Sequence, residues 1–139
     1  MASTSATLDL PIAPERVWQL IGGFGSLPDW LPYISSSVPA EGGRVRQLRN
    51  EEGGEIVERL VAFDDAARSY SYAILEAPFP VTDYLSTLSV REVPGQSGAS
   101  RVVWSGTFTP TDVSDDEAVE LFHGIYADGL AALRDTLAD

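Results

Sequence analysis

The order of the segments constrains the fold of this chain more than any other feature. An amphipathic helix is predicted from Pro14 to Phe24, strand-like segments follow from about Ser35 to Thr111, and one long helix closes the chain from about Asp115 to Leu137. A sheet followed by a single amphipathic helix buries most apolar surface when the sheet curls around that helix. The pattern therefore predicts an α+β fold with a cavity between the sheet and the last helix.

The first helix has clear start and stop signals. Pro14 suits the first helical turn, and Glu15 complements the positive end of the helix. The pair Gly22–Gly23 ends the apolar pattern. Val17, Leu20 and Ile21 form the apolar stripe. The proline-rich segment that follows, Ser26 to Tyr33, is predicted to be a short helix or a rigid loop.

The last helix opens with a capping box. Ser114 is a good N-cap, and Glu117 lies three residues further on. Gly124 and Gly129 each cost roughly 1 kcal/mol relative to alanine in a helix. Close backbone approach, room for a ligand and simple tolerance are alternative explanations of these glycines. The predicted apolar face consists of Ala118, Leu121, Phe122, Ile125, Tyr126, Gly129, Leu130, Leu133 and Leu137.

About seven strands, arranged as an antiparallel meander, are predicted between these helices and at the N-terminus. Alternating apolar residues bounded by glycine, proline and acidic turns define them. The first, which ends at a proline, is expected at a sheet edge. The predicted strands are Thr7–Ile12, Ser35–Ala40, Arg44–Arg49, Glu55–Phe63, Arg68–Leu75, Val81–Val93 and Ser100–Thr109.

Composition favours one soluble globular domain that spans residues 1–139. Hydrophobic residues make up 44% of the chain and charged residues 22%. No apolar run is long enough to cross a membrane, and the N-terminus lacks the basic and apolar parts of a secretion signal. We therefore expect a cytoplasmic protein with no integral membrane association. The cysteine count of 0 excludes disulfides, thiolate catalysis and cysteine metal ligands.

The charge balance argues against nucleic acid and anionic membrane surfaces as partners. The net charge is −12, from 9 basic and 21 acidic residues, and all the basic residues are arginines. Both kinds of partner need a cationic surface. Long edge strands are compatible with either a monomer or a homodimer.

Motifs for cofactors and metals are missing from the sequence. The glycines between Gly22 and Gly25 follow a helix rather than a strand, unlike a dinucleotide-binding turn. His123, the only histidine, is predicted on the polar face of the last helix. This placement argues against a Ser/His/Asp triad and a histidine metal site. We therefore expect no cofactor and no metal.

Glu58 is the strongest single candidate for chemistry. Strand alternation places it on one face with Ile56, Leu60 and Ala62. Burial there raises the pKa of a carboxyl unless the group is paired. Glu58 is thus a candidate ligand anchor or a general acid or base. The alternative is a structural carboxylate that pairs with a buried tyrosine, a water or an arginine.

Several aromatic side chains are predicted to line the same cavity. Tyr70 and Tyr72 share a strand face, and Tyr84 lies on the next long strand. A phenol combines an apolar body with one polar tip, which suits aromatic or polyketide-like ligands. Trp30 and Tyr33 flank the proline-rich segment and are expected to cover the cavity mouth. Ordinary core or loop packing is the alternative for all of them.

These segments resemble the START-like, or SRPBCC, superfamily of polyketide cyclases/dehydrases and lipid-transfer proteins. Its small bacterial branch includes a protein named for methanol oxidation. The resemblance spans nearly the whole chain and implies a helix-grip fold: a seven-stranded antiparallel sheet, with two short helices near the N-terminus, around a long C-terminal helix and an apolar cavity. The matching segments are Ala13–Trp18, Glu58–Leu60, Asp64–Asp65, Tyr70–Tyr72, Pro78–Pro80, Asp83–Tyr84 and Arg101–Phe108.

The plant abscisic-acid receptors of the same superfamily imply a set of cavity residues. Their hormone-anchoring lysine falls on Leu31, their first gate on Asn50–Gly54, and part of their second gate on Phe79–Pro80. These departures argue against hormone sensing. Together with Trp30, Tyr70 and Phe79, the predicted ligand-binding residues are Leu31, Tyr33, Glu58, Tyr72, Ile74, Tyr84, Ser86, Ser105, Leu121, Ile125 and Gly129.

Three hypotheses for function follow. The leading one is non-covalent binding of a small hydrophobic molecule between the sheet and the last helix. The second is a cyclase- or dehydratase-type enzyme in which Glu58 or a cavity tyrosine moves a proton. The third is an interaction module whose cavity is vestigial and filled with bulky side chains.

Overall fold

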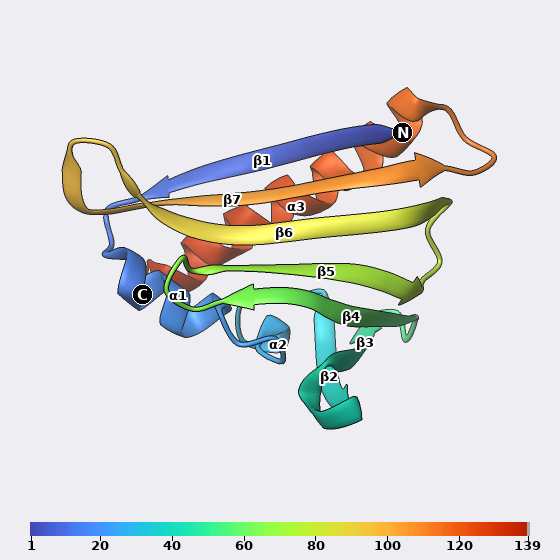
Figure 1. Ribbon diagram of the computed structural model, residues 1–139, viewed down its shortest axis with the longest axis horizontal. Helices are drawn as coiled ribbons and strands as arrows, with labels where there is room; N and C mark the ends of the chain where they lie inside the picture. The colour runs from blue at the N-terminus through green and yellow to red at the C-terminus, as the bar shows by residue number, and fades with distance from the viewer. Residues whose placement is uncertain (139) are drawn as a thin grey trace.

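The computed structural model describes residues 1–138 and shows one curved antiparallel sheet with a long helix across it (Figure 1). The helices are α1 (Pro14–Ile21), α2 (Leu27–Trp30) and α3 (Asp115–Leu137), with a short 3-10 turn at Glu41–Gly43. The strands are β1 (Ala2–Leu10), β2 (Ile34–Ala40), β3 (Val45–Asn50), β4 (Glu55–Asp64), β5 (Ser69–Glu76), β6 (Val81–Val93) and β7 (Gln96–Pro110). This arrangement confirms the predicted helix-grip fold.

The sheet is a meander that the N-terminal strand extends at one end. Its 7 strands lie in the order β1-β7-β6-β5-β4-β3-β2, so β1 and β2 are the edges. The predicted edge position of the first strand is confirmed, but β1 begins at Ala2 rather than Thr7. Its inward residues Ala2 and Ala6 are small and alternate with serine and threonine. Because this pattern has little hydrophobic contrast, the first half of the strand was not predicted.

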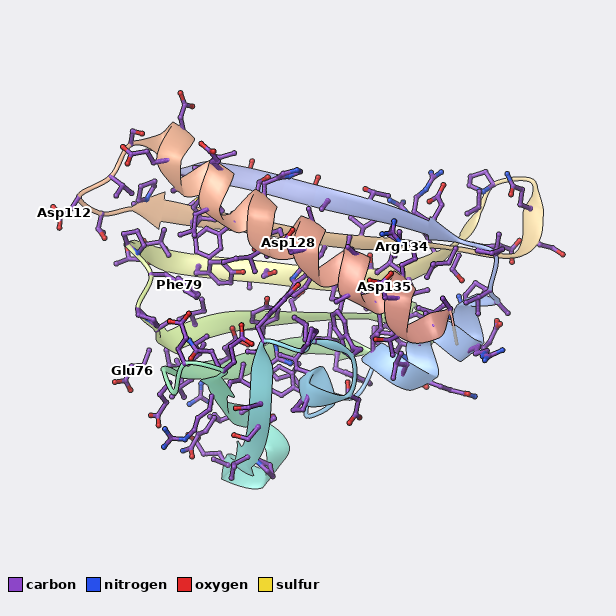
Figure 2. The ribbon with its side chains drawn as sticks, turned by 180° about the vertical axis from the view of Figure 1, so that it is seen from behind. Glu76, Phe79, Asp112, Asp128, Arg134 and Asp135 are labelled. Carbon is purple, nitrogen blue, oxygen red and sulfur yellow. The ribbon has the colours of Figure 1, made fainter. Side chains whose placement is uncertain are left out.

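Helix α3 lies across the concave face of the sheet (Figure 2). The predicted capping box is present: the Ser114 hydroxyl accepts from the backbone N–H of Glu117, whose side chain accepts from the backbone N–H of Ser114. Leu121 is 38% exposed, so its predicted place on the buried face is wrong. Ala118, Phe122, Tyr126, Gly129, Leu130 and Leu133 are the buried residues of this helix.

One of the two α3 glycines is required by packing. A Cβ atom at Gly129 would lie 2.6 Å from Cζ3 of Trp104 on β7, well inside van der Waals contact. A Cβ atom at Gly124 would meet nothing within 4 Å. Close backbone approach therefore explains Gly129, and Gly124 occupies open space.

Helices α1 and α2 close one end of the sheet. Val17 and Ile21 of α1 are fully buried, and the indole of Trp18 donates a 2.7 Å hydrogen bond to Oδ1 of Asp65. That bond ties α1 to the turn between β4 and β5. The helix ends at Ile21, at the predicted Gly22–Gly23 stop signal and short of Phe24.

Irregular pairing in β4 and β6 decides which residues face inward. The β4–β5 register shifts between Leu60 and Ala62, and Ala62 is exposed, so its predicted place beside Glu58 is wrong. In β6 the register shifts between Thr82 and Leu85, where Asp83 has a φ of 52°. Such a bulge redirects the side chains next to it. The bulge lies before Tyr84, which points inward in regular alternation with the buried Ser86, Leu88 and Val90.

Within residues 1–138, none of the helices combines the length and apolar character needed to cross a membrane.

Candidate functional site

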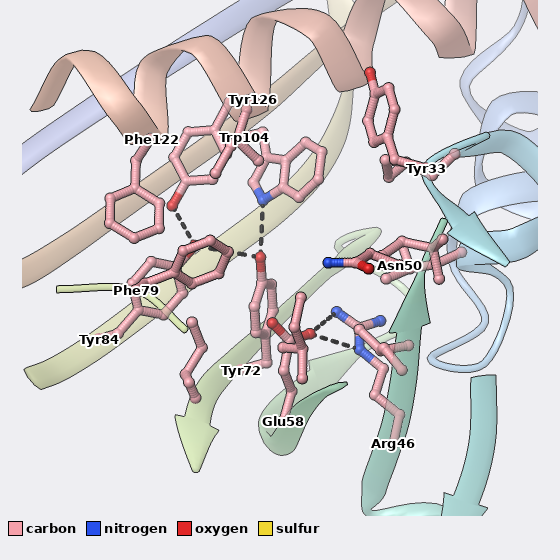
Figure 3. Close-up of a pocket in the computed structure, with 17 residues that line it drawn as sticks. Tyr33, Arg46, Asn50, Glu58, Tyr72, Phe79, Tyr84, Trp104, Phe122 and Tyr126 are labelled. Carbon is pink, nitrogen blue, oxygen red and sulfur yellow. Dashed lines mark hydrogen bonds and ion pairs between the residues drawn. The ribbon is translucent and has the colours of Figure 1, made fainter. Parts of the chain in front are cut away.

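A cavity of about 170 Å³ lies between the sheet and α3 (Figure 3). Most of its wall is formed by aliphatic and aromatic side chains from six strands, from α2 and α3 and from the adjoining loops. The lining residues are Leu27, Leu31, Tyr33, Ile34, Arg46, Leu48, Asn50, Ile56, Glu58, Tyr72, Ile74, Phe79, Tyr84, Trp104, Phe122, Ile125 and Tyr126.

A buried ion pair forms one side of this cavity. Arg46 on β3 and Glu58 on β4 are opposite each other in the strand register. Nε and Nη2 of Arg46 lie 2.8 and 2.7 Å from the same carboxylate oxygen, Oε1 of Glu58. Arg46 is 1% exposed and Glu58 6%, so both charges are compensated away from bulk water. The predicted alternative in which Glu58 pairs with an arginine is the one that the structure shows.

The Arg46 guanidinium is held from every side. Its Nη1 donates to the backbone oxygen of Phe24 at 2.8 Å and to the Tyr70 hydroxyl at 3.3 Å. Its carbon lies 4.1 Å from the centre of the Phe24 ring and 4.8 Å from that of Tyr72. Burial acts to lower the pKa of Arg46, but Tyr70 and Glu58 outweigh it and raise that pKa. Arg46 therefore remains a cation.

The second carboxylate oxygen of Glu58 faces the cavity. Among residues 1–138, Oε2 accepts no hydrogen bond, and Figure 3 shows it on the side of Glu58 away from Arg46. Burial raises the pKa of Glu58, although the charge and hydrogen bonds of Arg46 oppose this rise. Glu58 thus presents one unoccupied, poorly hydrated acceptor to any molecule in the cavity.

A chain of phenol, indole and serine groups forms the opposite side. The Trp104 indole donates to the Tyr72 hydroxyl and to Oγ of Ser86, both at 3.1 Å. The hydroxyls of Tyr84 and Tyr126 are hydrogen-bonded at 2.5 Å. The hydroxyl of Tyr72 lies 3.5 Å from the hydroxyl of Tyr84. These bonds join β5, β6, β7 and α3, so they fix the shape of the cavity from four elements.

Burial keeps the phenols of this chain neutral. It raises the pKa of Tyr72, Tyr84 and Tyr126, since each charged form would lose its hydration. The hydroxyls therefore act as hydrogen-bond donors and acceptors rather than as phenolate bases near neutral pH.

Gly106 on β7 makes room for the Tyr126 hydroxyl. A Cβ atom there would lie 2.2 Å from that oxygen and 3.2 Å from Cζ of the same ring. Without a side chain at position 106, the α3 phenol reaches the sheet and bonds to Tyr84.

The structure places some predicted site residues at the cavity. They come from the loop before β2, from three strands, from the β5–β6 loop and from α3. They are Leu31, Tyr33, Glu58, Tyr72, Ile74, Phe79, Tyr84 and Ile125. Their contact with a ligand remains a prediction.

The other predicted residues lie away from the cavity wall. Trp30 is buried against Trp104 rather than at a cavity mouth, and Tyr70 lies behind Arg46. Ser86 lies beneath Trp104, and its hydroxyl donates to the backbone oxygen of Ser105. The side chain of Ser105 is on the outer face of the sheet. Leu121 is exposed and Gly129 packs on Trp104, so neither lines the cavity.

Several lining residues escaped the sequence analysis. Arg46 and Asn50 lie in a strand whose hydrophobic pattern is weak, although Arg46 alternates with the buried Leu48. Trp104, Phe122 and Tyr126 were recognised as strand or helix residues but not as site residues. Leu27, Ile34, Leu48 and Ile56 complete this group.

His123 is exposed, as predicted, and contacts the first strand. Its Nδ1 lies 3.2 Å from the backbone oxygen of Ser5 and 3.4 Å from Oγ1 of Thr4. In the part of the chain that the structure describes, no three His, Asp or Glu side chains are grouped to hold a metal ion.

The fold and cavity define a START-like protein, and sequence comparison gives the family. The family model described as polyketide cyclase/dehydrase and lipid transport matches residues 1–138, so the chain belongs to this family. The solved structure of XoxI from Bacillus cereus is 59% identical, with a TM-score of 0.96 over 100% of this chain and 97% of that one. A Bacillus thuringiensis protein is 56% identical, with a TM-score of 0.96 over 99% and 100% of the two chains.

More distant structures share the fold. The Zhui aromatase/cyclase from Streptomyces sp. R1128 is 17% identical, with a TM-score of 0.74 over 96% of this chain and 89% of that one. At this identity the similarity concerns the architecture alone.

Proposed function

We propose that the protein binds a small hydrophobic molecule in the cavity between the sheet and α3. The observation that supports this most directly is the largely apolar cavity of about 170 Å³, in which a few polar groups converge. Ligand sites are typically concave, mostly apolar and furnished with a small number of placed polar groups. The family description, which includes lipid transport, is consistent with such a role.

The cavity volume sets the size of the ligand. A cavity of roughly 150 Å³ lined by apolar side chains accommodates benzene, and this one is only slightly larger, at about 170 Å³. A molecule with one ring and a small substituent fits without rearrangement. A long acyl chain or a multi-ring polyketide exceeds this volume.

The vestigial-cavity hypothesis is less well supported. It predicts bulky side chains that fill the space between sheet and helix. Phe79, Phe122 and Trp104 do project inward, yet open volume remains among them. Open apolar volume lowers stability, because its lining loses van der Waals contacts. A binding function supplies a reason to retain it.

Proton transfer is the second candidate, and the unoccupied Oε2 of Glu58 is the observation that favours it. This oxygen faces the cavity, and burial raises the pKa of its carboxyl. A carboxyl with those properties can move a proton to or from a bound molecule. Glu58→Gln tests this: a variant that turns the natural ligand over at the wild-type rate removes Glu58 as an acid or base.

The binding proposal is tested by native mass spectrometry of the protein purified from its own host, followed by identification of the released molecule. A stoichiometric hydrophobic ligand supports the proposal and gives its chemical class. A protein that is empty, and that gains no thermal stability from a library of aromatic and lipid molecules, overturns it.

A matched pair of variants locates the binding. Ile74 and Leu75 are neighbours on β5, but Ile74 lines the cavity, whereas Leu75 is 51% exposed on the outer face. Ile74→Phe fills the cavity and is expected to abolish binding. Leu75→Phe adds a similar ring outside and is expected to leave binding unchanged. Equal loss in both variants contradicts binding at this cavity.

A further inference from the structure

Asn50 directs a hydrogen-bond donor into the cavity. Its Oδ1 accepts from the backbone N–H of Glu52 at 3.0 Å and from that of Gly54 at 2.7 Å. Two backbone donors on one atom identify that atom as the amide oxygen. The other end of the amide is therefore the NH₂ group, and Figure 3 shows it directed toward the cavity, where Asn50 forms part of the wall.

The turn after β3 holds this amide in place. The backbone N–H of Asn50 donates to the oxygen of Gly54 at 2.9 Å, and Gly53 donates back to the oxygen of Asn50 at 3.0 Å. A Cβ atom at Gly54 would lie 2.8 Å from Nδ2 of Asn50, so glycine leaves room for the amide. Within residues 1–138 no acceptor bonds to Nδ2. The donor is preorganised and unused.

Glu58 supplies the complementary acceptor in the same cavity. Arg46 occupies Oε1 through a hydrogen bond from Nε and an ion-pair contact from Nη2, which leaves Oε2 unbonded. A ligand group that donates to this oxygen supplies the hydrogen bond that the protein itself does not make. The cavity thus presents one fixed donor and one fixed acceptor among apolar walls.

We infer that the ligand is a neutral, single-ring molecule that carries both a hydroxyl and a carbonyl-type oxygen. The hydroxyl donates to Oε2 of Glu58, and the oxygen accepts from Nδ2 of Asn50. This inference rests on the proposed binding function and specifies its ligand class. The ring occupies the apolar space among Tyr72, Ile74 and Phe79.

The charges around the cavity favour a neutral ligand over an ionised one. Arg46 and Glu58 compensate each other, so the wall has no net charge to offset a carboxylate or an ammonium group. A carboxylate would face the unbonded oxygen of Glu58, and an ammonium group would enter beside the Arg46 guanidinium. Either charged group would lose its hydration in an apolar cavity. This loss costs free energy unless an opposite charge is free to pair with the group, and Arg46 and Glu58 already pair with each other.

Calorimetric titration of the whole protein with size-matched probes tests the inference. Meta-hydroxyacetophenone carries the donor and the acceptor. Meta-ethylphenol carries the donor, meta-methoxyacetophenone the acceptor, and meta-ethyltoluene neither. Each missing hydrogen bond is expected to weaken binding by about tenfold. Meta-hydroxybenzoate and meta-hydroxybenzylamine are the charged comparisons, and both are expected to bind more weakly than the neutral ketone.

Asn50→Asp is the variant that isolates the donor. Aspartate retains an oxygen for the two backbone N–H groups, so the turn is preserved, but it replaces the NH₂ group with a second acceptor. At about pH 8, where a carboxyl is ionised, we expect about tenfold weaker binding of meta-hydroxyacetophenone and no loss for meta-ethylphenol. Glu58→Gln is the companion variant for the hydroxyl. If it does not fold, Asn50→Asp and the wild-type probe series still decide the question.

The outcomes separate this inference from the binding proposal. The inference is supported if each missing hydrogen bond weakens binding to the wild-type protein as expected. It also requires that Asn50→Asp weaken the binding of meta-hydroxyacetophenone but not that of meta-ethylphenol. Equal affinity for all four neutral probes, or tightest binding of a charged probe, overturns it and leaves the cavity as a binding site. A lack of binding by every probe, including meta-ethyltoluene, contradicts both.

Discussion

Arg46 holds a single carboxylate oxygen of Glu58 through a 2.8 Å hydrogen bond from Nε and a 2.7 Å ion-pair contact from Nη2. This geometry pairs the Arg46 guanidinium with a carboxylate and leaves the other carboxylate oxygen, Oε2, facing the cavity. The pair therefore contributes both to the core and to the candidate site.

Removing one member of this pair is expected to destabilise the fold far more than removing both. Arg46→Met leaves a buried carboxylate unpaired, which costs roughly 3–5 kcal/mol of unfolding free energy. Arg46→Met with Glu58→Leu replaces both charges with apolar groups of similar size, so its stability is expected to lie near that of the wild type. Urea denaturation of the single and double variants measures the coupling. Additive losses would mean that the two residues contribute independently.

The two glycines of α3 give opposite predictions on one helix. Gly124→Ala meets no neighbour and gains roughly 0.5–1 kcal/mol from better helix propensity. Gly129→Ala forces Trp104 away from the helix and is expected to lose about 1–3 kcal/mol despite the same gain. Thermal denaturation of the two variants provides the comparison. A stabilised Gly129→Ala protein would show that Trp104 moves without cost.

The sequence was sufficient to predict the order of elements but not the pairing inside the cavity. Strand alternation and the Ser114 capping box are local signals, and both are confirmed. The partner of Glu58 depends on which strand lies beside β4 and in which register, and the weak pattern of β3 concealed Arg46. Asn50 was equally hidden, because its orientation depends on backbone donors in a turn.

A bulge in β4 and the limits of resemblance account for three further errors. Strict alternation placed Ala62 beside Glu58, whereas the register shift in β4 turns it outward. Leu121 and Ser105 were assigned from resemblance, but their side chains face outward from α3 and from β7. A one-residue shift in strand pairing is not readable from sequence.

Gly106 and Tyr126 are predicted to be energetically coupled. Gly106→Ala places a methyl group where the Tyr126 hydroxyl lies, so it is expected to break the bond to Tyr84 and cost about 1–3 kcal/mol. Tyr126→Phe removes the clashing oxygen and leaves the ring 3.2 Å from the new Cβ. The double variant should therefore be more stable than the sum of the single losses predicts. Urea denaturation of the four proteins tests this, and strict additivity would contradict it.

The buried phenols predict a loss of stability in alkali. The pKa of Tyr72, Tyr84 and Tyr126 lies above the ordinary value of 10.0 in the folded protein. Above about pH 10 the unfolded chain releases these protons while the folded chain retains them. The unfolding free energy then falls as pH rises, by about 1.4 kcal/mol per pH unit for each phenol. Below pH 10 both states are protonated, and these groups give no pH dependence.

Tyrosinate absorbance and urea denaturation between about pH 9 and pH 12 check this prediction, since the range spans the ordinary phenol pKa. The folded protein should ionise fewer than its 5 tyrosines until it unfolds. In Tyr126→Phe the fall in unfolding free energy should be shallower, because one retained proton is gone. Ionisation of all 5 tyrosines near pH 10 in a protein that is still folded would show that the phenol chain is open to solvent.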